Sequence, residues 1–191
     1  LVNSCTSALH LALICSGIKQ GDEVITSPYT FASTANVIVH CGAKPMFVDV
    51  EKDTLNINPE LIEEKITDKT RAIIAVHFAG HSCDMDAITK IARKHDLIVI
   101  EDAAHAFGTK YKGLQCGTLS AFGTYSFYAT KNLTMGEGGM IICPTPDVAE
   151  RVRMLKLHGI SKDAYKRYEQ SGSWYYEVEE CGFKYNLPDI Q

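Results

Sequence analysis

The sequence lacks the patterns that would place this 191-residue chain in a membrane or on nucleic acid. No apolar run approaches the roughly 18 residues that a membrane-spanning helix needs. Lysine and arginine form no long run, and the net charge is −4. Nucleic-acid phosphates are bound by clustered basic side chains, so this distribution argues against DNA or RNA as the main partner. We therefore expect no membrane and no nucleic acid among the partners.

Paired cysteines are also missing. The seven cysteines form no C-x-x-C motif, and an odd number cannot all pair within one chain. The start of the chain shows no charged-then-apolar leader, so we expect reduced thiols and a cytoplasmic location. The chain opens at Leu1 inside a motif and stops at Gln191 where a helix pattern begins, which indicates a fragment of a longer polypeptide.

What is present is an alternation of strand-like and helix-like patterns, typical of a parallel sheet covered by helices. The expected fold class is α/β, with a mostly parallel sheet sandwiched by helices and a single domain over residues 1–191. No pattern assigns a structure to the aromatic, polar segment after Gly159. The spacing predicts helices at 6–16, 29–40, 59–66, 85–95 and 147–157, and strands at 23–26, 45–50, 71–78, 97–102, 124–128 and 140–143.

Three polar features fall at the expected strand ends: the Ser4–Ser7 turn, Asp102, and Ser126 together with Lys131. In parallel α/β sheets, ligands gather at the carboxyl ends of the strands. Most lysines are solvated surface charges. Lys131 is a candidate site residue only because it follows a buried strand and has a hydroxyl five residues upstream. The coincidence of the three features indicates a ligand site at this edge.

Each feature has two interpretations. Thr6 or Ser7 could cap the helix that follows, or could bind a small phosphate at the helix N-terminus. The sequence has neither a P-loop nor a G-x-G-x-x-G motif. Asp102 could form a structural ion pair or could pair with a protonated heterocyclic nitrogen. Pyridoxal phosphate requires a lysine Schiff base, an aspartate at its ring nitrogen and a phosphate site, and this chain offers all three.

Six motifs in order resemble the DegT/DnrJ/StrS-type nucleotide-sugar aminotransferases, a family of fold-type I pyridoxal phosphate enzymes. The resemblance runs from Asn3 to Gln191 and implies the cofactor-binding large domain, without the C-terminal small domain. The motifs are Thr6-Ser7-Ala8-Leu9, Gly21-Asp22-Glu23-Val24-Ile25, Thr30-Phe31-Ala32-Ser33-Thr34-Ala35-Asn36, Glu101-Asp102-Ala103-Ala104-His105, Ser126-Phe127-Tyr128 with Lys131-Asn132-Leu133, and Gly136-Glu137-Gly138-Gly139.

The resemblance implies a role for each matching residue in binding pyridoxal 5′-phosphate. Lys131 would form the Schiff base and carry the proton between substrate and cofactor. Asp102 would keep the ring nitrogen protonated, His105 would lie near the ring and its O3′, and Phe31 would stack on the ring face. Without the resemblance, Phe31 could equally be a core aromatic of the expected helix.

The resemblance also implies a phosphate site and a second subunit. Thr6, Ser7 and Ser126 would hold the phosphate. Asn186 would reach the phosphate of a neighbouring subunit, which implies a homodimer with shared active sites. Cys5 departs from the family, which usually has glycine there, so the close approach of backbone to phosphate could be altered.

Two further groups are alternatives to this site. His77, His81 and Cys83 have a spacing found among metal ligands, but no fourth ligand is evident, and structural zinc normally takes four. Asp84 and Asp86 flank a helix start and fit capping roles. We assign no metal site.

The function that the resemblance implies is transfer of an amino group from an amino acid, with glutamate as the expected donor, to a nucleotide-linked keto-sugar. The product would be an amino sugar of the kind used in polysaccharide biosynthesis. A related branch, the sugar dehydratases, has histidine in place of the lysine, so Lys131 favours transamination. A non-catalytic, cofactor-binding regulatory protein and another fold-type I enzyme such as a desulfurase remain alternatives.

Overall fold

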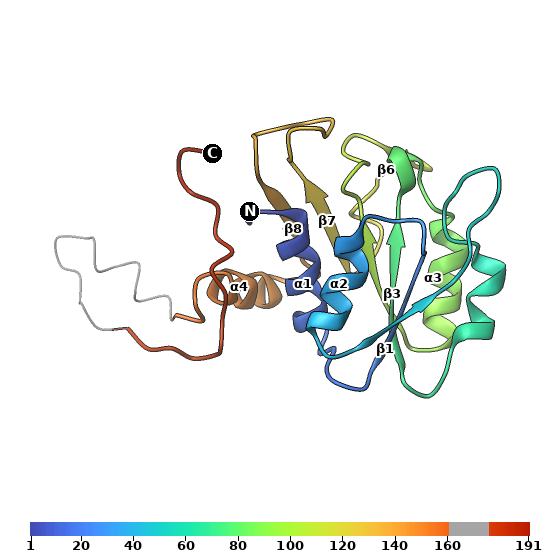
Figure 1. Ribbon diagram of the computed structural model, residues 1–191, viewed down its shortest axis with the longest axis horizontal. Helices are drawn as coiled ribbons and strands as arrows, with labels where there is room; N and C mark the ends of the chain where they lie inside the picture. Colours follow the sequence, from blue (N-terminus) through green and yellow to red (C-terminus); the bar gives the residue numbers. More distant parts are fainter. Residues whose placement is uncertain (161–175) are drawn as a thin grey trace.

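The computed structural model describes residues 1–160 and 176–191 (Figure 1), so Trp174 and Tyr175 of the late aromatic segment lie outside the described residues. In the described part, the α-helices are α1 (Cys5–Cys15), α2 (Ala32–His40), α3 (Met85–Lys94) and α4 (Pro146–Leu155). The main-sheet strands are β1 (Glu23–Thr26), β2 (Lys44–Phe47), β3 (Thr70–Val76), β4 (Ile98–Asp102), β7 (Phe122–Ser126) and β8 (Gly139–Ile142).

The main sheet has the order β2-β1-β3-β4-β7-β8. Neighbouring strands from β2 to β7 run parallel, and β8 runs antiparallel to β7 at the edge. Val76 pairs with Asp102, and Asp102 pairs with Thr124, so the carboxyl ends of β3, β4 and β7 lie at one edge. This edge is where the sequence predicts a site.

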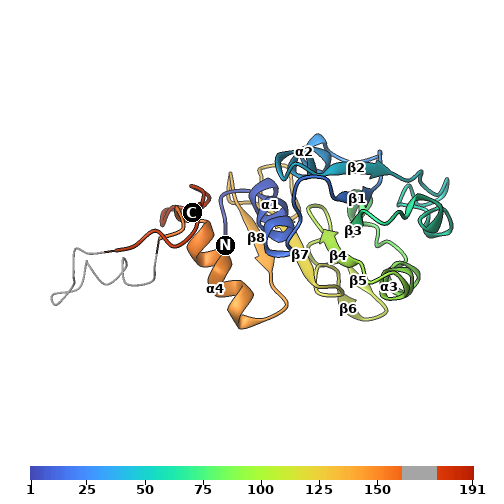
Figure 2. The ribbon, with the colours of Figure 1, turned by 90° about the horizontal axis from the view of Figure 1, so that it is seen from below.

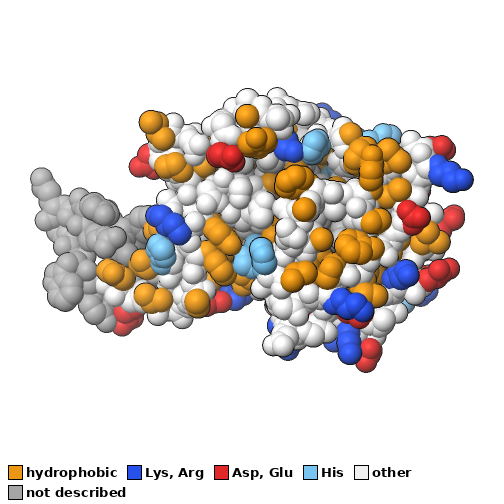
Figure 3. Space-filling model, viewed as in Figure 1, with side chains coloured by type: hydrophobic (Ala, Val, Ile, Leu, Met, Phe, Trp, Pro, Cys, Tyr) orange, Lys and Arg blue, Asp and Glu red, His pale blue; other side chains and the backbone are white. Residues whose placement is uncertain are grey.

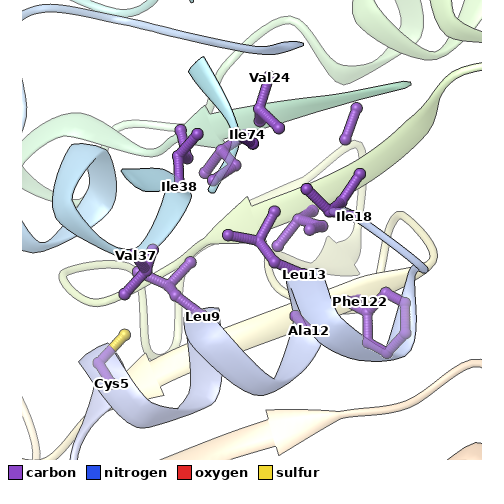
Figure 4. Packing of buried hydrophobic residues seen from close by; sticks show 13 residues of the cluster. Cys5, Leu9, Ala12, Leu13, Ile18, Val24, Val37, Ile38, Ile74 and Phe122 are labelled. Atoms are coloured by element: carbon purple, nitrogen blue, oxygen red, sulfur yellow. The ribbon is translucent and has the colours of Figure 1, made fainter. Parts of the chain in front are cut away.

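Strand β3 shows why helices cover both faces of the sheet. Its side chains alternate, so Ala72 and Ile74 pack with α1 and α2 in one cluster, shown in Figure 4, whereas Ile73 and Ala75 pack with α3 in another. Seen from below, α1 and α2 lie on one side of the sheet and α3 on the other (Figure 2). The predicted α/β class, with a mostly parallel sheet sandwiched by helices, is confirmed.

Helix α1 is the central helix of this arrangement. Ser4 is its N-cap and accepts a hydrogen bond from the backbone N–H of Ser7. Leu9 and Leu13 pack toward the sheet and α2, whereas Ala8 and Leu11 pack with α4. A helix that is apolar on all sides is stable only when it is buried on all sides. Burial of each leucine side chain contributes roughly 1.5–3 kcal/mol.

One predicted helix is wrong. Residues 59–66 form two short 3-10 helices, η1 (Pro59–Leu61) and η2 (Glu63–Lys65), instead of one α-helix. Asn58 is the N-cap of η1 and accepts a hydrogen bond from the backbone N–H of Glu60. The segment buries Ile62 completely and keeps η2 at the surface. A short helix with so little packed surface has little to stabilise its continuation.

Some boundaries differ from expectation, and one small element was not predicted. Helix α2 begins at Ala32, three residues later than predicted, and Phe31 stands at its N-cap position. Strand β7 ends at Ser126, two residues earlier than predicted, and Lys131 lies in the loop that follows. A small hairpin, β5 (Lys110–Tyr111) with β6 (Leu114–Gln115), has no counterpart among the predicted elements. Its turn residues Lys112 and Gly113 both have positive φ, the geometry of a type I′ turn, although the usual signal is Asn-Gly or Asp-Gly.

The C-terminal segment, residues 183–185, returns to the start of α1. The backbone N–H of Asn3 donates to the carbonyl of Tyr185, and the N–H of His158 donates to the carbonyl of Phe183. The chain thereby runs beside α1 and α4 (Figure 1).

The surface carries charges of both signs. On the face drawn in Figure 3, Lys and Arg side chains are dispersed among acidic and hydrophobic ones. All seven cysteines are free thiols. None of the helices in the described residues combines the length and the apolar character required to cross a membrane.

Candidate active site

A cavity of about 690 Å³ opens at the carboxyl edge of the sheet. Its walls come from the start of α1, the loop before α2, the ends of β3, β4 and β7, and the loop after β7. The lining includes the predicted site residues Thr6, Phe31, Asp102, His105, Ser126 and Lys131. The two other predicted residues, Ser7 and Asn186, are not part of its lining.

Asp102 is the carboxylate of this cavity. It is the last residue of β4 and is 5% exposed. One carboxylate oxygen, Oδ2, accepts a hydrogen bond of 2.8 Å from the hydroxyl of Thr34, and the other, Oδ1, accepts one of 3.2 Å from the backbone N–H of Ala104. These donors supply hydrogen-bond partners to both oxygens of a buried carboxylate.

Lys131 reaches the cavity from the loop after β7. Its Nζ lies 2.6 Å from Nε2 of His105. An ammonium group can only donate, so Nε2 of His105 is the acceptor and the imidazole is neutral. Burial lowers the pKa of His105 and the positive charge of Lys131 lowers it further, against the opposing effect of Asp102. The contact therefore holds the amine of Lys131 beside a neutral histidine at the cavity wall.

The N-terminus of α1 forms a further wall of the cavity. Thr6 is exposed there, at the positive end of the helix dipole. Gly139 of β8 makes the local packing possible, because a Cβ atom at this position would come within 2.3 Å of the carbonyl carbon of Ser4. Ser126, at the end of β7, also lines the cavity. The exposed hydroxyl of Thr6, the helix dipole and Ser126 together can bind a small anion.

Ser7 is not part of this wall. Its hydroxyl donates to the side-chain oxygen of Asn3 and lies 2.8 Å from the hydroxyl of Ser4. The expectation that Thr6 or Ser7 could cap the helix is wrong, because Ser4 is the cap.

Cys5 lines the cavity next to Asp102. Its sulfur lies 4.0 Å from Oδ1 of Asp102. Burial raises the pKa of the Cys5 thiol, and the charge of Asp102 raises it further, so the thiol keeps its proton and is a weak donor toward the carboxylate. The residue that departs from the family pattern thus contacts the carboxylate of the site.

Phe31 stands at the mouth of the cavity with 79% of its surface exposed. An aromatic ring so exposed is not a core residue, which removes the alternative of a core aromatic. Its neighbour Tyr29 packs against Phe78 from the turn after β3.

Asn186 lies on the C-terminal segment, outside the cavity lining. Its side-chain oxygen is buried and has no hydrogen-bond partner in the described residues. Its amide nitrogen reaches the carbonyl of Leu187 at 3.5 Å. The predicted contact with a second subunit stays a prediction.

Two of the residues considered as metal ligands, His77 and Cys83, are engaged in other contacts, and the thiol of Cys83 lies 3.1 Å from the carbonyl of Val76. His77 accepts the backbone N–H of Cys83 at Nδ1, so its Nε2 carries the proton and donates to Glu101 at 3.0 Å. Within residues 1–160 and 176–191, no group of three or more His, Cys, Asp or Glu side chains could hold a metal ion. Asp84 is the N-cap of α3, as predicted, and accepts the backbone N–H of Ala87.

Comparison with known proteins decides the family. The model of the DegT/DnrJ/EryC1/StrS aminotransferase family matches residues 1–191. The chain belongs to this family. The resemblance inferred from the motifs is thereby confirmed.

Two curated proteins match the whole chain. The protein MJ1066 of Methanocaldococcus jannaschii is 61% identical over 190 residues, and the spore coat polysaccharide biosynthesis protein SpsC of Bacillus subtilis is 55% identical over 190 residues. The chain covers 49% of each, so it spans about half the length of these relatives.

Solved structures of aminotransferases have the same fold. DesV of S. venezuelae has a TM-score of 0.89 at 38% identity, and the aminotransferase of Psychrobacter cryohalolentis has 0.91 at 38%. The putative sugar aminotransferase Spr1654 of Streptococcus pneumoniae, in its PLP form, has 0.89 at 34%. These matches cover 99–100% of this chain and 48–51% of the solved chains.

Sequence reasoning missed the partners of Asp102 in this family member. Thr34 lies 68 positions away from it, inside the motif Thr30–Asn36 that supports the family match, but the motif alone assigns no role to its hydroxyl. Thr34 is completely buried on the first turn of α2, which only the structure reveals, so no signal in the sequence indicates this contact.

Proposed function

We propose that the protein containing this chain is a pyridoxal phosphate-dependent aminotransferase that transfers an amino group from an amino acid to a nucleotide-linked keto-sugar. The observation that carries the proposal is that Lys131 and Asp102 line the same cavity at the carboxyl edge of the sheet. A volume of about 690 Å³ falls within the range of small-molecule and cofactor sites.

The residues at the cavity fit pyridoxal phosphate. Thr6 at the α1 N-terminus and Ser126 would hold its phosphate, Asp102 would pair with its ring nitrogen, and Phe31 would cover its ring. When bound, the cofactor supplies an electron sink for negative charge on the substrate carbon. The PLP and PMP forms of the relative Spr1654 support this choice of cofactor.

The chain's own residues would bind the cofactor and move the proton. Nζ of Lys131 would hold the cofactor and later accept and return the proton of the substrate carbon. Nε2 of His105 would keep this amine oriented over the cavity, since it already accepts its hydrogen bond. Asp102 would remain charged and keep the proton on the ring nitrogen, held by its donors Thr34 and Ala104.

A sugar acceptor is supported by the relatives. SpsC is named a spore coat polysaccharide biosynthesis protein, and Spr1654 is described as a putative sugar aminotransferase. Lys131 favours transamination over the dehydratase branch, in which histidine replaces this lysine. Glutamate as donor, a homodimer that shares Asn186 across subunits, and a cytoplasmic location complete the proposal.

The test uses the full-length protein loaded with pyridoxal phosphate. We expect a visible absorption band from the bound cofactor, its conversion to the amine form when glutamate is added, and glutamate consumption with a nucleotide keto-sugar. Lys131→Ala should abolish the band and lower turnover by roughly 100- to 10,000-fold, because the covalent link and the proton carrier are lost. Lys110→Ala, at an exposed lysine of β5, is the matched control.

Other outcomes would assign a different function. A protein that binds the cofactor but does not convert it with any amino acid would be a binding protein. A sugar product that has lost a hydroxyl group without gaining an amine would indicate a dehydratase.

A further inference from the structure

Thr34 is a buried hydroxyl that joins the cavity to the first turn of α2. It is completely buried, and its Oγ1 lies 2.8 Å from Oδ2 of Asp102 and 2.8 Å from Oγ1 of Thr30. A buried hydroxyl with a partner on each side is a fixed part of a hydrogen-bond network rather than a free polar group.

The direction of both hydrogen bonds follows from chemistry. A carboxylate can only accept, so Thr34 must use its single proton toward Asp102. The oxygen of Thr34 is then the acceptor for the hydroxyl of Thr30. The result is an ordered relay from Thr30 through Thr34 to Asp102.

This relay fixes the carboxylate from the side opposite to its own strand. Oδ1 of Asp102 is held by the backbone N–H of Ala104, which lies two residues along the same chain. Oδ2 is held by Thr34, which comes from α2. Removal of the Thr34 hydroxyl would leave only Oδ1 of the carboxylate held, and the χ2 angle, which has a broad energy well, would be less restrained.

The relay also reaches the cavity wall. Thr30 lines the cavity and directly precedes Phe31, the exposed aromatic at its mouth. Hydrogen bonds to a charged group are stronger than those between neutral groups, so the Thr34 link is the stronger of the two.

We propose that Thr34 is a positioning residue that orients the carboxylate of Asp102 toward the cofactor ring nitrogen, with Thr30 as its support. The inference rests on the proposed function. It predicts that loss of one hydroxyl, remote from the reacting atoms, changes the state of the bound cofactor as well as the rate.

The experiment compares Thr34→Val with Thr34→Ser in the full-length protein loaded with pyridoxal phosphate. Thr34→Val keeps the shape but removes the hydroxyl. We expect the cofactor to bind more weakly in a spectroscopic titration, the pH profile of its visible band to shift, and kcat to fall on the order of 10- to 100-fold at unchanged sugar KM. Thr34→Ser keeps the hydroxyl and should restore all three.

The control is Thr26→Val. Thr26 is also completely buried and also donates one hydrogen bond, to the carbonyl of Ile74 at 3.1 Å, but it does not line the cavity. It should lower thermal stability as much as Thr34→Val does, with the pH profile and kcat unchanged. Should Thr34→Val fail to fold, Thr30→Val tests the half-buried end of the relay, with smaller shifts in the same direction expected.

The outcomes separate the two proposals. The role of Thr34 alone is overturned if the wild-type protein shows the band but Thr34→Val has the same pH profile and kcat as Thr26→Val. Where Thr30→Val replaces Thr34→Val, an unchanged pH profile and kcat in Thr30→Val overturn it in the same way. A wild-type protein that shows no band with the cofactor overturns the proposed function, and the role of Thr34 falls with it.

Discussion

Glu101 and Asp102 are adjacent carboxylates on β4, both buried, with different surroundings. Glu101 is 0% exposed and does not line the cavity. Both of its oxygens are occupied by donors from separate segments, namely Nε2 of His77 (3.0 Å), the backbone N–H groups of Gly117 (2.6 Å) and Leu119 (2.7 Å), and the hydroxyl of Ser120 (3.0 Å).

Asp102 has fewer donors and faces the cavity. A carboxylate can accept about four hydrogen bonds, so Asp102 keeps capacity for a ligand where Glu101 keeps none. Burial alone therefore does not identify a functional carboxylate. A buried carboxylate that lines a cavity and can still accept further hydrogen bonds is the better candidate.

The charge of Glu101 is consistent with a structural role. Burial by itself would raise its pKa, but the hydrogen bonds from His77 and from the N–H of Gly117 outweigh burial, and its pKa is lowered overall. The charged side chain of Glu101 therefore links residues 117–120 to β4 through hydrogen bonds.

If the two carboxylates differ in this way, the largest loss of turnover should occur in Asp102→Asn, measured in the full-length, cofactor-loaded protein. Asparagine keeps the shape and one acceptor oxygen, so the free energy of unfolding should change by only about 1 kcal/mol. Turnover should fall roughly 100- to 1,000-fold, because a charged group directed at the reacting system is lost. Steady-state kinetics and urea unfolding measure the two effects. A large loss of stability with turnover preserved would place Asp102 in the same class as Glu101.

Glu101→Gln should show the reverse pattern. The amide nitrogen of glutamine would face an N–H donor of Gly117 or Leu119, so the free energy of unfolding should fall by about 3 kcal/mol. Turnover per folded molecule should fall far less than in Asp102→Asn. Glu64→Gln, at an exposed carboxylate on η2, is the matched control and should stay within about 0.5 kcal/mol of wild type. Equal stability of the two variants in urea unfolding would contradict a structural role for Glu101.

The same pair shows how far the sequence could lead. The apolar run before Asp102 predicts β4 correctly, because a strand covered on both faces is recognisable from its own residues. Its position at the carboxyl edge follows from general rules of parallel sheets. The sequence alone therefore assigns Lys131 and Asp102 to one site.

The partners of the two carboxylates could not be predicted, since they depend on contacts between distant segments. Thr34 lies 68 positions from Asp102, and Gly117 lies 16 positions from Glu101 across the unpredicted β5–β6 hairpin. Ser7 shows a local limit, because three hydroxyls stand close together at the α1 start. The extended backbone of Ser4 (φ −165°, ψ 160°) makes Ser4 the cap.

A smaller effect is expected at His10, a buried histidine of α1 whose Nδ1 lies 3.1 Å from the hydroxyl of Tyr185. Burial, and secondarily His40, lowers its pKa from 6.5. The unfolded state then binds more protons just below pH 6.5, so stability falls as the pH drops through this window, with a slope of at most about 1.4 kcal/mol per pH unit for this residue.

This window is separate from that of Glu101. Because the folded-state pKa of Glu101 is lowered, its contribution to stability is complete above about pH 4.5 and is lost only as the pH falls toward the folded value.

His10→Asn retains an acceptor near the Nδ1 position and should flatten only the upper part of the stability profile, between pH 7 and pH 5. Urea unfolding between pH 7 and pH 5 measures the slope, and His105, whose lowered pKa acts in the same window, is left unchanged in all variants. Tyr185→Phe keeps the burial of His10, the larger cause, and should preserve the slope. A slope that disappears in Tyr185→Phe would assign the effect to the hydrogen bond instead of to burial.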